Sequence, residues 1–268
     1  MAARPIITLL TDFGEGTYVP SVKGVLLGLA PDARIIDITH TVSLGDIGTA
    51  GRLLRHTAPY FPEGSIHLAV VDPGVGGNRR PVVLRADHSY FVGPDNGLFG
   101  AIVETCDSVE AFVIHEGSWT PRRVAPTFHG RDIFAHVAGG LARGDPPDRF
   151  GNPVPPETLV PLPGPRPRYE KNRCSGRVVW VDRYGNLITD LEREEVERWR
   201  GDSPFRACLG GTWIDTRVHT FSDAEAGSLV VLFGSWETLE VVVAAGSASD
   251  RLDVGIGEPI VLERIHAR

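Results

Sequence analysis

Three separated segments of the sequence combine acidic, basic and imidazole side chains with glycine. They are Thr11-Asp12-Phe13-Gly14, Val71-Asp72-Pro73-Gly74-Val75-Gly76 with Arg79 behind it, and Thr127-Phe128-His129-Gly130-Arg131-Asp132. Glycine lets the backbone approach a ligand closely. A carboxylate, a guanidinium and an imidazole brought together can orient a small nucleophile and accept its proton. The three segments therefore predict a catalytic site.

Asp12 follows an apolar stretch, 6–10, that reads as a buried strand. At the end of such a strand its carboxylate could accept two hydrogen bonds from a ribose diol, as acidic residues do in nucleotide-binding sheets. A helix N-cap or an ordinary turn aspartate explains the same position equally well.

Asp72 begins an Asp-Pro-Gly turn that matches neither the phosphate-loop pattern nor the dinucleotide glycine pattern. Local sequence alone favours a plain loop here, because Asp-Pro commonly begins a turn. Arg79 and Arg80 are adjacent, so on an extended chain their side chains point to opposite faces. We expect at most one of them to enter a site.

His129 precedes a predicted helix, whose positive N-terminal dipole would lower the pKa of the imidazole. A lone histidine is more often structural. Further along, Asp182 and Asn186 lie in Asp-Arg-Tyr-Gly-Asn, which reads as a hairpin turn. The same two side chains could also bind an amino group and the edge of a base.

Composition narrows the class of protein. The chain has 268 residues, 42% hydrophobic and 23% charged, which is typical of a globular protein. A net charge of −7 argues against nucleic acid as a partner. No apolar run approaches the roughly 20 residues of a membrane span, and the start does not read as a signal peptide, so we expect a cytoplasmic protein without a membrane partner.

Metal and disulfide chemistry receive no support from the sequence. The three cysteines, Cys106, Cys174 and Cys208, are far apart and include no CxxC pair. The histidines show no metal-ligand spacing. We therefore expect free thiols and no metal site.

The first 160 residues alternate strand and helix patterns. This alternation predicts an α/β domain with a mostly parallel sheet, whose strands place ligands beyond their carboxyl ends. Asp12 and Asp72 each follow such a strand. The predicted strands span 6–10, 34–38, 65–71, 81–85, 89–92 and 109–114, and the predicted helices 19–30, from about 46, and 131–141.

A proline-rich stretch, 153–167, interrupts this pattern, because proline cannot continue a helix or an inner strand. We predict an N-terminal α/β domain over 1–160, a linker over 161–170 and a smaller C-terminal domain over 171–268. The last reads as an antiparallel β-barrel or sandwich interrupted by a helix at 192–199. Its predicted strands span 176–182, 186–189, 208–214, 228–232, 239–244 and 259–262.

Taken in order, the segments TDFG, ITHTV, DPGVG, GPDNGLFG, TFHGRDIF and DRYGN resemble one family over residues 6–262. It is the S-adenosyl-L-methionine hydroxide adenosyltransferases, the hydrolytic relatives of the fluorinases and chlorinases. The resemblance implies cleavage of S-adenosylmethionine by water to adenosine and L-methionine, with no cofactor. It also implies an α/β domain followed by a β-barrel, in a homotrimer with sites between subunits.

Matching by motif, the resemblance implies roles for eight residues. Asp72, Arg79 and His129 correspond to the water-activating set. Five others correspond to substrate-binding positions: Asp12 for the ribose, Phe128 near the reacting carbon, Asp182 and Asn186 for the amino end of methionine and for adenine, and Ser235 for the methionine carboxylate. Ser235 lies in Gly-Ser-Trp, which departs from the family pattern.

Two other functions remain open. The halogenating relatives carry tyrosine, threonine and serine where this chain has Asp72, Val75 and Gly130. A carboxylate in a halide pocket would repel the anion, so hydrolysis is favoured over halogenation. The third possibility is a non-catalytic protein that binds S-adenosylmethionine or a nucleoside.

Overall fold

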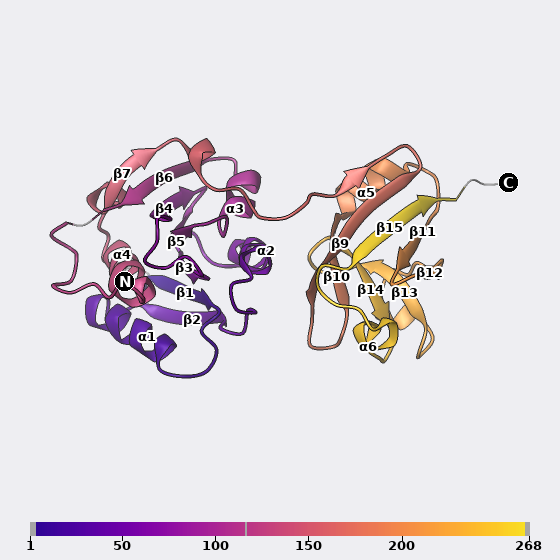
Figure 1. The fold of residues 1–268 in the computed structure, drawn as a ribbon, viewed down its shortest axis with the longest axis horizontal. Helices are drawn as coiled ribbons and strands as arrows, with labels where there is room; N and C mark the ends of the chain where they lie inside the picture. Colours follow the sequence, from indigo (N-terminus) through magenta and orange to yellow (C-terminus); the bar gives the residue numbers. More distant parts are fainter. Residues whose placement is uncertain (1–3, 116, 266–268) are drawn as a thin grey trace. The chain divides into compact units, whose positions relative to one another are not determined.

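The computed structural model describes residues 4–115 and 117–265. The chain divides into two compact units, Met1–Gly164 and Pro165–Arg268, within the proline-rich stretch (Figure 1). Each unit has its own hydrophobic core.

The first unit is built on a seven-stranded sheet with the order β2-β1-β3-β5-β4-β6-β7. The pairs β1–β2, β1–β3 and β3–β5 are parallel, whereas β4–β5, β4–β6 and β6–β7 are antiparallel. The predicted α/β class is confirmed, and the sheet is mixed. The strands are β1 (Ile6–Thr11), β2 (Arg34–Thr39), β3 (Ile66–Val70), β4 (Arg80–Ala86), β5 (Ser89–Asp95), β6 (Val109–Ile114) and β7 (Gly151–Val154).

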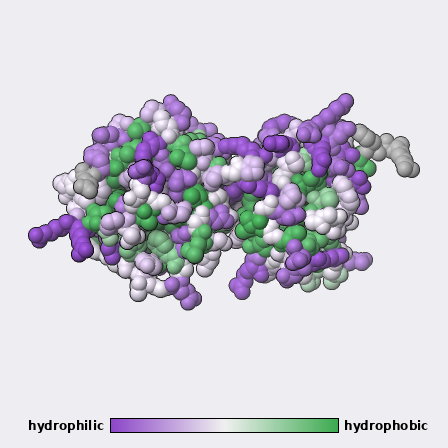
Figure 2. All heavy atoms as spheres, in the orientation of Figure 1, coloured by the Kyte–Doolittle hydropathy of each residue, from purple (hydrophilic) through white to green (hydrophobic). Residues whose placement is uncertain are grey.

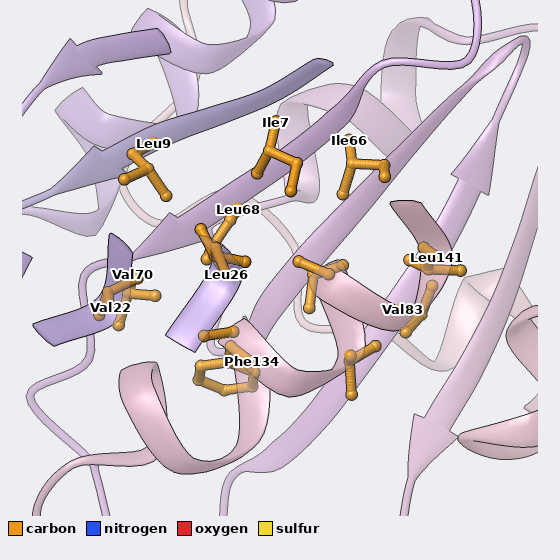
Figure 3. Packing of buried hydrophobic residues seen from close by; sticks show 14 of the residues in the cluster. Ile7, Leu9, Val22, Leu26, Ile66, Leu68, Val70, Val83, Phe134 and Leu141 are labelled. Atoms are coloured by element: carbon orange, nitrogen blue, oxygen red, sulfur yellow. The ribbon is translucent and has the colours of Figure 1, made fainter. Parts of the chain in front are cut away.

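Helices pack on this sheet because its central strands are apolar on both faces. On one face, α1 (Tyr18–Leu29) and α4 (Ala135–Ala142) contribute Leu26 and Leu141 to one buried cluster with Leu9 and Leu68 of the sheet (Figure 3). Removing such side chains from water stabilises the unit by about 1.5–3 kcal/mol each. The parallel strands β1 and β3 are thereby fixed beside each other, with their carboxyl ends at one edge.

Two further helices, α2 (Ile47–Thr57) and α3 (Gly100–Thr105), contact each other. Asp46 begins α2 as its N-cap, because its Oδ1 accepts a hydrogen bond of 2.9 Å from the Thr49 backbone N–H. Helix α4 is preceded by a π-helical turn, η2 (Gly130–Phe134), so the predicted helix at 131–141 begins in a π-turn. Such turns often occur at functional sites.

The second unit is an antiparallel, nearly closed barrel with strand order β12-β11-β15-β9-β10-β14-β13, and β8 pairs with β9. An isolated bridge between Arg217 and Val231 brings the chain after β12 next to β13. The strands are β8 (Arg168–Tyr169), β9 (Arg173–Val181), β10 (Leu187–Glu192), β11 (Phe205–Leu209), β12 (Thr212–Ile214), β13 (Leu229–Phe233), β14 (Thr238–Val243) and β15 (Pro259–Arg264), and the helices are α5 (Arg193–Arg200) and α6 (Ala248–Leu252).

The predicted elements differ from the structure at a few places. The single strand predicted at 208–214 is the hairpin of β11 and β12, because Gly210 and Gly211 both take a positive φ and form a turn. The prediction missed α3, α6, β7 and β8, all of them short. Strand β7 contains Pro153 and lies at the sheet edge, where a missing N–H is tolerated.

Hydrophilic residues are distributed over the visible surface of both units, interspersed with hydrophobic ones (Figure 2). Within 4–115 and 117–265, none of the helices combines the length and the apolar character that a bilayer crossing requires.

Candidate active site

The carboxyl ends of β1, β3 and β5 lie side by side because these strands are parallel neighbours. Asp12, Asp72 and Asn96 follow these three ends within two residues. The Asn96 amide donates a hydrogen bond of 2.9 Å to the Val71 carbonyl and so holds the backbone just before Asp72. The structure places Asp12 and Asp72 at the carboxyl edge of the sheet, where the sequence predicted them.

Asp72 and Arg79 form a buried ion pair, with side-chain exposures of 5% and 9%. Arg79 Nε lies 3.0 Å from both Asp72 oxygens, and Nη2 donates to Oδ2 at 2.6 Å. The neighbouring Arg80 binds Asp95 instead, at 2.8 Å and 2.5 Å. This confirms that only one of the two adjacent arginines faces Asp72.

His129 completes the cluster from the start of η2. Arg79 Nη2 lies 2.6 Å from His129 Nδ1. Because a guanidinium has only donors, Nδ1 must accept, and the neutral ring carries its proton on Nε2. Burial and the Arg79 charge lower the pKa of His129 against the opposing charges of Asp72 and Asp132. The pKa shifts in the expected direction, and burial and Arg79 are causes that the sequence alone did not reveal.

Gly76 explains how the histidine segment comes close to Asp72. Its φ is +76°, and a Cβ atom there would lie 2.6 Å from the Pro126 carbonyl oxygen. Only glycine fits this close approach of two loops without strain. The Asp-Pro-Gly segment does form a turn, in which the Val75 N–H donates to the Asp72 carbonyl at 3.2 Å. The turn and the ion pair therefore occur together.

Asp12 is not a helix cap, since α1 begins after Thr17. Its Oδ2 accepts a hydrogen bond of 2.9 Å from the Gly45 N–H. Among the described residues, the other carboxylate oxygen has no hydrogen-bond partner. Asp12 therefore keeps an acceptor for a ligand.

These side chains surround a pocket of about 300 Å³ in the first unit. Phe128 packs edge to face against Phe13 and Tyr18, with ring centroids 5.9 Å and 5.1 Å away. Arg79 is not a lining residue and contacts the pocket through Asp72 and His129. The lining residues are Asp12, Phe13, Leu44, Gly45, Val70, Asp72, Pro73, Val75, Thr127, Phe128, His129 and Gly130.

The second unit contains a separate pocket of about 250 Å³, which includes the predicted residues Asp182, Asn186 and Ser235. The Asp182 carboxylate accepts hydrogen bonds from the backbone N–H groups of Tyr184 and Asn186 and from the Asn186 amide, at 2.8, 2.9 and 2.9 Å. The turn chemistry expected for this segment is therefore present. Its residues also line a cavity.

Sequence reasoning missed the other polar and aromatic residues of this second pocket. Trp180 and Trp236 stack at 4.8 Å with an interplanar angle of 13°, and Glu240 lies in β14. Glu240 had a detectable signal, because it is an acidic residue inside the apolar stretch 239–244. Phe13 and Leu44 of the first pocket were missed as well, because isolated apolar residues carry no signal of their own.

In the part of the chain that the structure describes, no group of three or more His, Cys, Asp or Glu side chains could hold a metal ion. The described cysteines form no disulfide, and Cys174 is buried.

The same combination of units occurs in known proteins. The N-terminal domain of the SAM (S-adenosyl-L-methionine) hydroxide adenosyltransferases matches residues 7–151, and their C-terminal domain matches residues 176–261. A crystal structure of an uncharacterized conserved protein from Thermotoga maritima has a TM-score of 0.89 and 33% identity, over 96% of this chain and 100% of that one.

Curated relatives cover nearly the whole chain. A protein of Salinispora tropica named (R)-S-adenosyl-L-methionine hydrolase is 39% identical over 96% of this chain and 97% of its own length. A protein of Thermus thermophilus with the same name is 39% identical over 97% of this chain and 99% of its own length. A fluorinase of an Actinoplanes species is 27% identical over 87% of this chain and 88% of its own length. The chain belongs to the SAM hydroxide adenosyltransferase family.

Proposed function

We propose that this protein is an enzyme that hydrolyses S-adenosyl-L-methionine to adenosine and L-methionine by displacement at the ribose 5′ carbon. The observation that carries the proposal is the buried cluster of Asp72, Arg79 and His129, which borders a pocket large enough to hold a ribose. Family membership adds support, since the relatives at 39% identity are named hydrolases.

Water is a poor nucleophile, so its activation determines the rate. Asp72 Oδ1 accepts one hydrogen bond, from Arg79 Nε, and a carboxylate oxygen has two lone pairs. The second lone pair can accept a proton from water. The His129 Nε2–H is a donor that can stabilise the developing hydroxide. Asp72 therefore takes the proton, and Arg79 positions Asp72 and His129 for this task.

The leaving group needs no acid. As the water oxygen bonds to the 5′ carbon, the carbon–sulfur bond breaks and its electron pair neutralises the positively charged sulfur of methionine. The proton of the attacking water passes to Asp72 and then to solvent. Catalysis consequently rests on orienting water in line with the carbon–sulfur bond.

The remaining predicted residues bind the substrate. In the first pocket, Asp12 accepts hydrogen bonds from the ribose hydroxyls and Phe128 contacts the sugar near the reacting carbon. In the second pocket, Asp182 binds the amino end of methionine, Asn186 binds adenine and Ser235 donates to the methionine carboxylate. We place these roles in a homotrimer whose sites lie between subunits, as the motif resemblance implies. Size-exclusion chromatography with light scattering measures the subunit number.

The three free thiols favour a reducing compartment, and we propose the cytoplasm. Localisation of a tagged chain by cell fractionation checks this assignment.

Product analysis distinguishes hydrolysis from the other two functions. Purified protein is incubated with each sulfonium epimer of S-adenosylmethionine, with and without chloride or fluoride, and the nucleosides are separated chromatographically. We expect adenosine and methionine in equal amounts, independent of halide, and faster release from the (R) epimer. A halogenated nucleoside would identify a halogenase, and bound, unchanged substrate would identify a binding protein.

Replacing Asp12 with Ala is expected to lower kcat/KM by about 10- to 100-fold, because a hydrogen bond to a charged group contributes about 1.5–3 kcal/mol. The 2′,3′-dideoxy analogue of the substrate serves as the internal control. Wild-type protein should favour the natural substrate, whereas Asp12→Ala should turn over both at similar rates. A variant that keeps the full preference would show that Asp12 does not bind the ribose.

A further inference from the structure

His40 is the histidine of the ITHTV segment, which the proposed mechanism leaves without a role. It directly follows β2, and its side chain is 16% exposed. The pairing of β1 with β2 shifts by one residue near the end of the two strands. Such irregularities often occur next to active sites. Here His40 lies beside Thr11, the last residue of β1 and the neighbour of Asp12.

His40 holds segment 11–14 at both of its ends. At the start of the segment, His40 Nδ1 lies 2.8 Å from Thr11 Oγ1. At its end, the Gly14 N–H donates to the His40 carbonyl at 2.8 Å. Asp12 and Phe13 lie between these two contacts, and both line the first pocket. One residue therefore fixes the backbone from which the Asp12 carboxylate projects.

The contacts around Thr11 fit one protonation state of His40. Thr11 is 2% exposed, and its hydroxyl oxygen accepts a hydrogen bond of 3.2 Å from the Phe13 N–H. The hydroxyl can then donate its own proton to His40 Nδ1, which accepts when the ring carries its proton on Nε2. Nε2 lies 3.1 Å from Asp37 Oδ1, and a carboxylate oxygen is an acceptor. A neutral ring with its proton on Nε2 therefore fits these contacts.

Asp37 contacts the ring from the side opposite Thr11. Its other oxygen, Oδ2, accepts a hydrogen bond of 2.6 Å from Lys23 Nζ of α1. Burial raises the pKa of the Asp37 carboxyl, but the contacts with Lys23 and His40 outweigh burial and lower the pKa below its usual value. Because the Asp37 side chain is 40% exposed, we expect it to contribute less than the buried Thr11.

A second threonine–histidine pair in β1 provides a structural comparison. Thr8 Oγ1 lies 2.8 Å from His67 Nδ1, and both residues are 0% exposed. Neither of them lines the first pocket. Thr8 and Thr11 therefore make the same kind of contact at the same distance, one in the interior of the unit and one next to Asp12. Comparing the two pairs separates a loss of stability from a loss of binding.

We infer that His40 is a positioning residue for ribose binding, which holds Asp12 through Thr11 and Gly14 where the carboxylate can accept hydrogen bonds from the ribose hydroxyls. His40 does not line the pocket, so it acts through Asp12. The inference rests on the proposed function, which assigns the ribose to Asp12.

Two variants of His40 test the contact with Thr11. His40→Leu removes the acceptor and should lower kcat/KM for S-adenosylmethionine about 3- to 30-fold, mainly through KM, since the buried hydroxyl loses its partner. In His40→Asn the amide oxygen is as many bonds from Cβ as Nδ1 is, so it can accept from Thr11. His40→Asn should therefore recover most of the loss. Equal kcat/KM values for His40→Leu and wild-type protein would contradict the inference.

The threonine variants distinguish positioning from general stability. Thr11→Val removes the hydroxyl but keeps the shape of the side chain, and should lower kcat/KM as His40→Leu does. Thr11→Ser keeps the hydroxyl and should retain most of the activity. Thr8→Val is the matched control: urea denaturation should show a loss of stability in both valine variants, whereas Thr8→Val keeps kcat/KM. An equal loss of kcat/KM in Thr8→Val would show that the effect is structural.

The 2′,3′-dideoxy analogue and a double variant show whether His40 acts through Asp12. Wild-type protein should favour the natural substrate, and His40→Leu should lose part of this preference. Adding His40→Leu to Asp12→Ala should not lower kcat/KM further, because residues that act through one contact are not additive. If the two losses add in full, His40 acts independently of Asp12 and the inference is wrong.

The outcomes separate this inference from the proposed function. If wild-type protein releases adenosine and His40→Leu keeps the full preference for the natural substrate, the His40 assignment is wrong and hydrolysis stands. If wild-type protein releases no adenosine, the hydrolase proposal fails. Calorimetric binding of adenosine and 2′,3′-dideoxyadenosine to both proteins then decides the His40 assignment: a smaller preference for adenosine in His40→Leu supports it, and an equal preference contradicts it.

Discussion

Replacing Asp72 with Asn is expected to lower kcat about 10²- to 10⁴-fold, the usual contribution of general-base catalysis. The amide keeps an oxygen that can accept a hydrogen bond from Arg79, but it cannot take a proton from water. Because Asp12 and the second pocket are unchanged, KM should change only a few-fold. Steady-state kinetics with S-adenosylmethionine measure both quantities.

Asp95→Asn is the matched control for this variant. Asp95 is a second buried aspartate of the same unit that pairs with an arginine, the half-buried Arg80, and it does not line the pocket. Breaking a buried ion pair destabilises a protein by about 3–5 kcal/mol when it leaves the partner charge uncompensated. Both variants should therefore lose stability, while only Asp72→Asn loses turnover. Equal kcat values for the two folded variants would rule out Asp72 as the base.

Replacing Glu240, a buried carboxylate that lines the second pocket, with Gln is expected to stabilise the folded protein by up to about 3 kcal/mol above pH 7. The pKa of Glu240 is raised from 4.5 to about 7, and each pKa unit corresponds to 1.36 kcal/mol. A raised carboxyl pKa means that the folded state holds the proton more tightly than the unfolded state. Stability of the wild-type protein is thus lost as pH rises from about 4.5 to 7.

Glutamine carries no titrating proton and avoids this loss. The difference in unfolding free energy between variant and wild type should be small at pH 4.5 and reach its full size at pH 8. Urea denaturation at both pH values, followed by tryptophan fluorescence, measures it, since Trp180, Trp199, Trp213 and Trp236 all lie in the second unit. Glu263→Gln is the control, since Glu263 forms an exposed ion pair with Arg206 in the same unit. It should show no such rise, because exposed ion pairs contribute at most about 1 kcal/mol. A Glu240 variant that gains nothing at pH 8 would contradict the burial argument.

The sequence predicted the parts of the fold whose pattern is local. Two continuous apolar strands, each followed by an aspartate, were sufficient to predict that Asp12 and Asp72 lie at the carboxyl edge of the sheet. The antiparallel half of the first sheet was harder to predict, because β4 and β6 read as strands without revealing their direction and the short β7 was missed. The division between the two units falls after Gly164, within the proline-rich stretch.

Charged residues within motifs could be selected from the sequence as candidates for the site. Contacts that depend on tertiary packing could not be predicted from it. Motif order brought Asp72, Arg79 and His129 together, but it could not reveal that Nδ1 of His129 accepts from Arg79 and therefore carries no proton. Glu240 was overlooked although an acidic residue inside an apolar strand is a signal, because the sequence does not show that its side chain lines a pocket.

Hydrolysis of S-adenosylmethionine in oxygen-18 water, followed by mass spectrometry of the nucleoside, most directly tests displacement by an activated water. We expect adenosine with one heavy oxygen at the 5′ position and methionine without label, since water attacks carbon and the carbon–sulfur bond breaks. Adenosine without the heavy oxygen would show that its 5′ hydroxyl does not come from water, and would contradict displacement by a water that Asp72 activates.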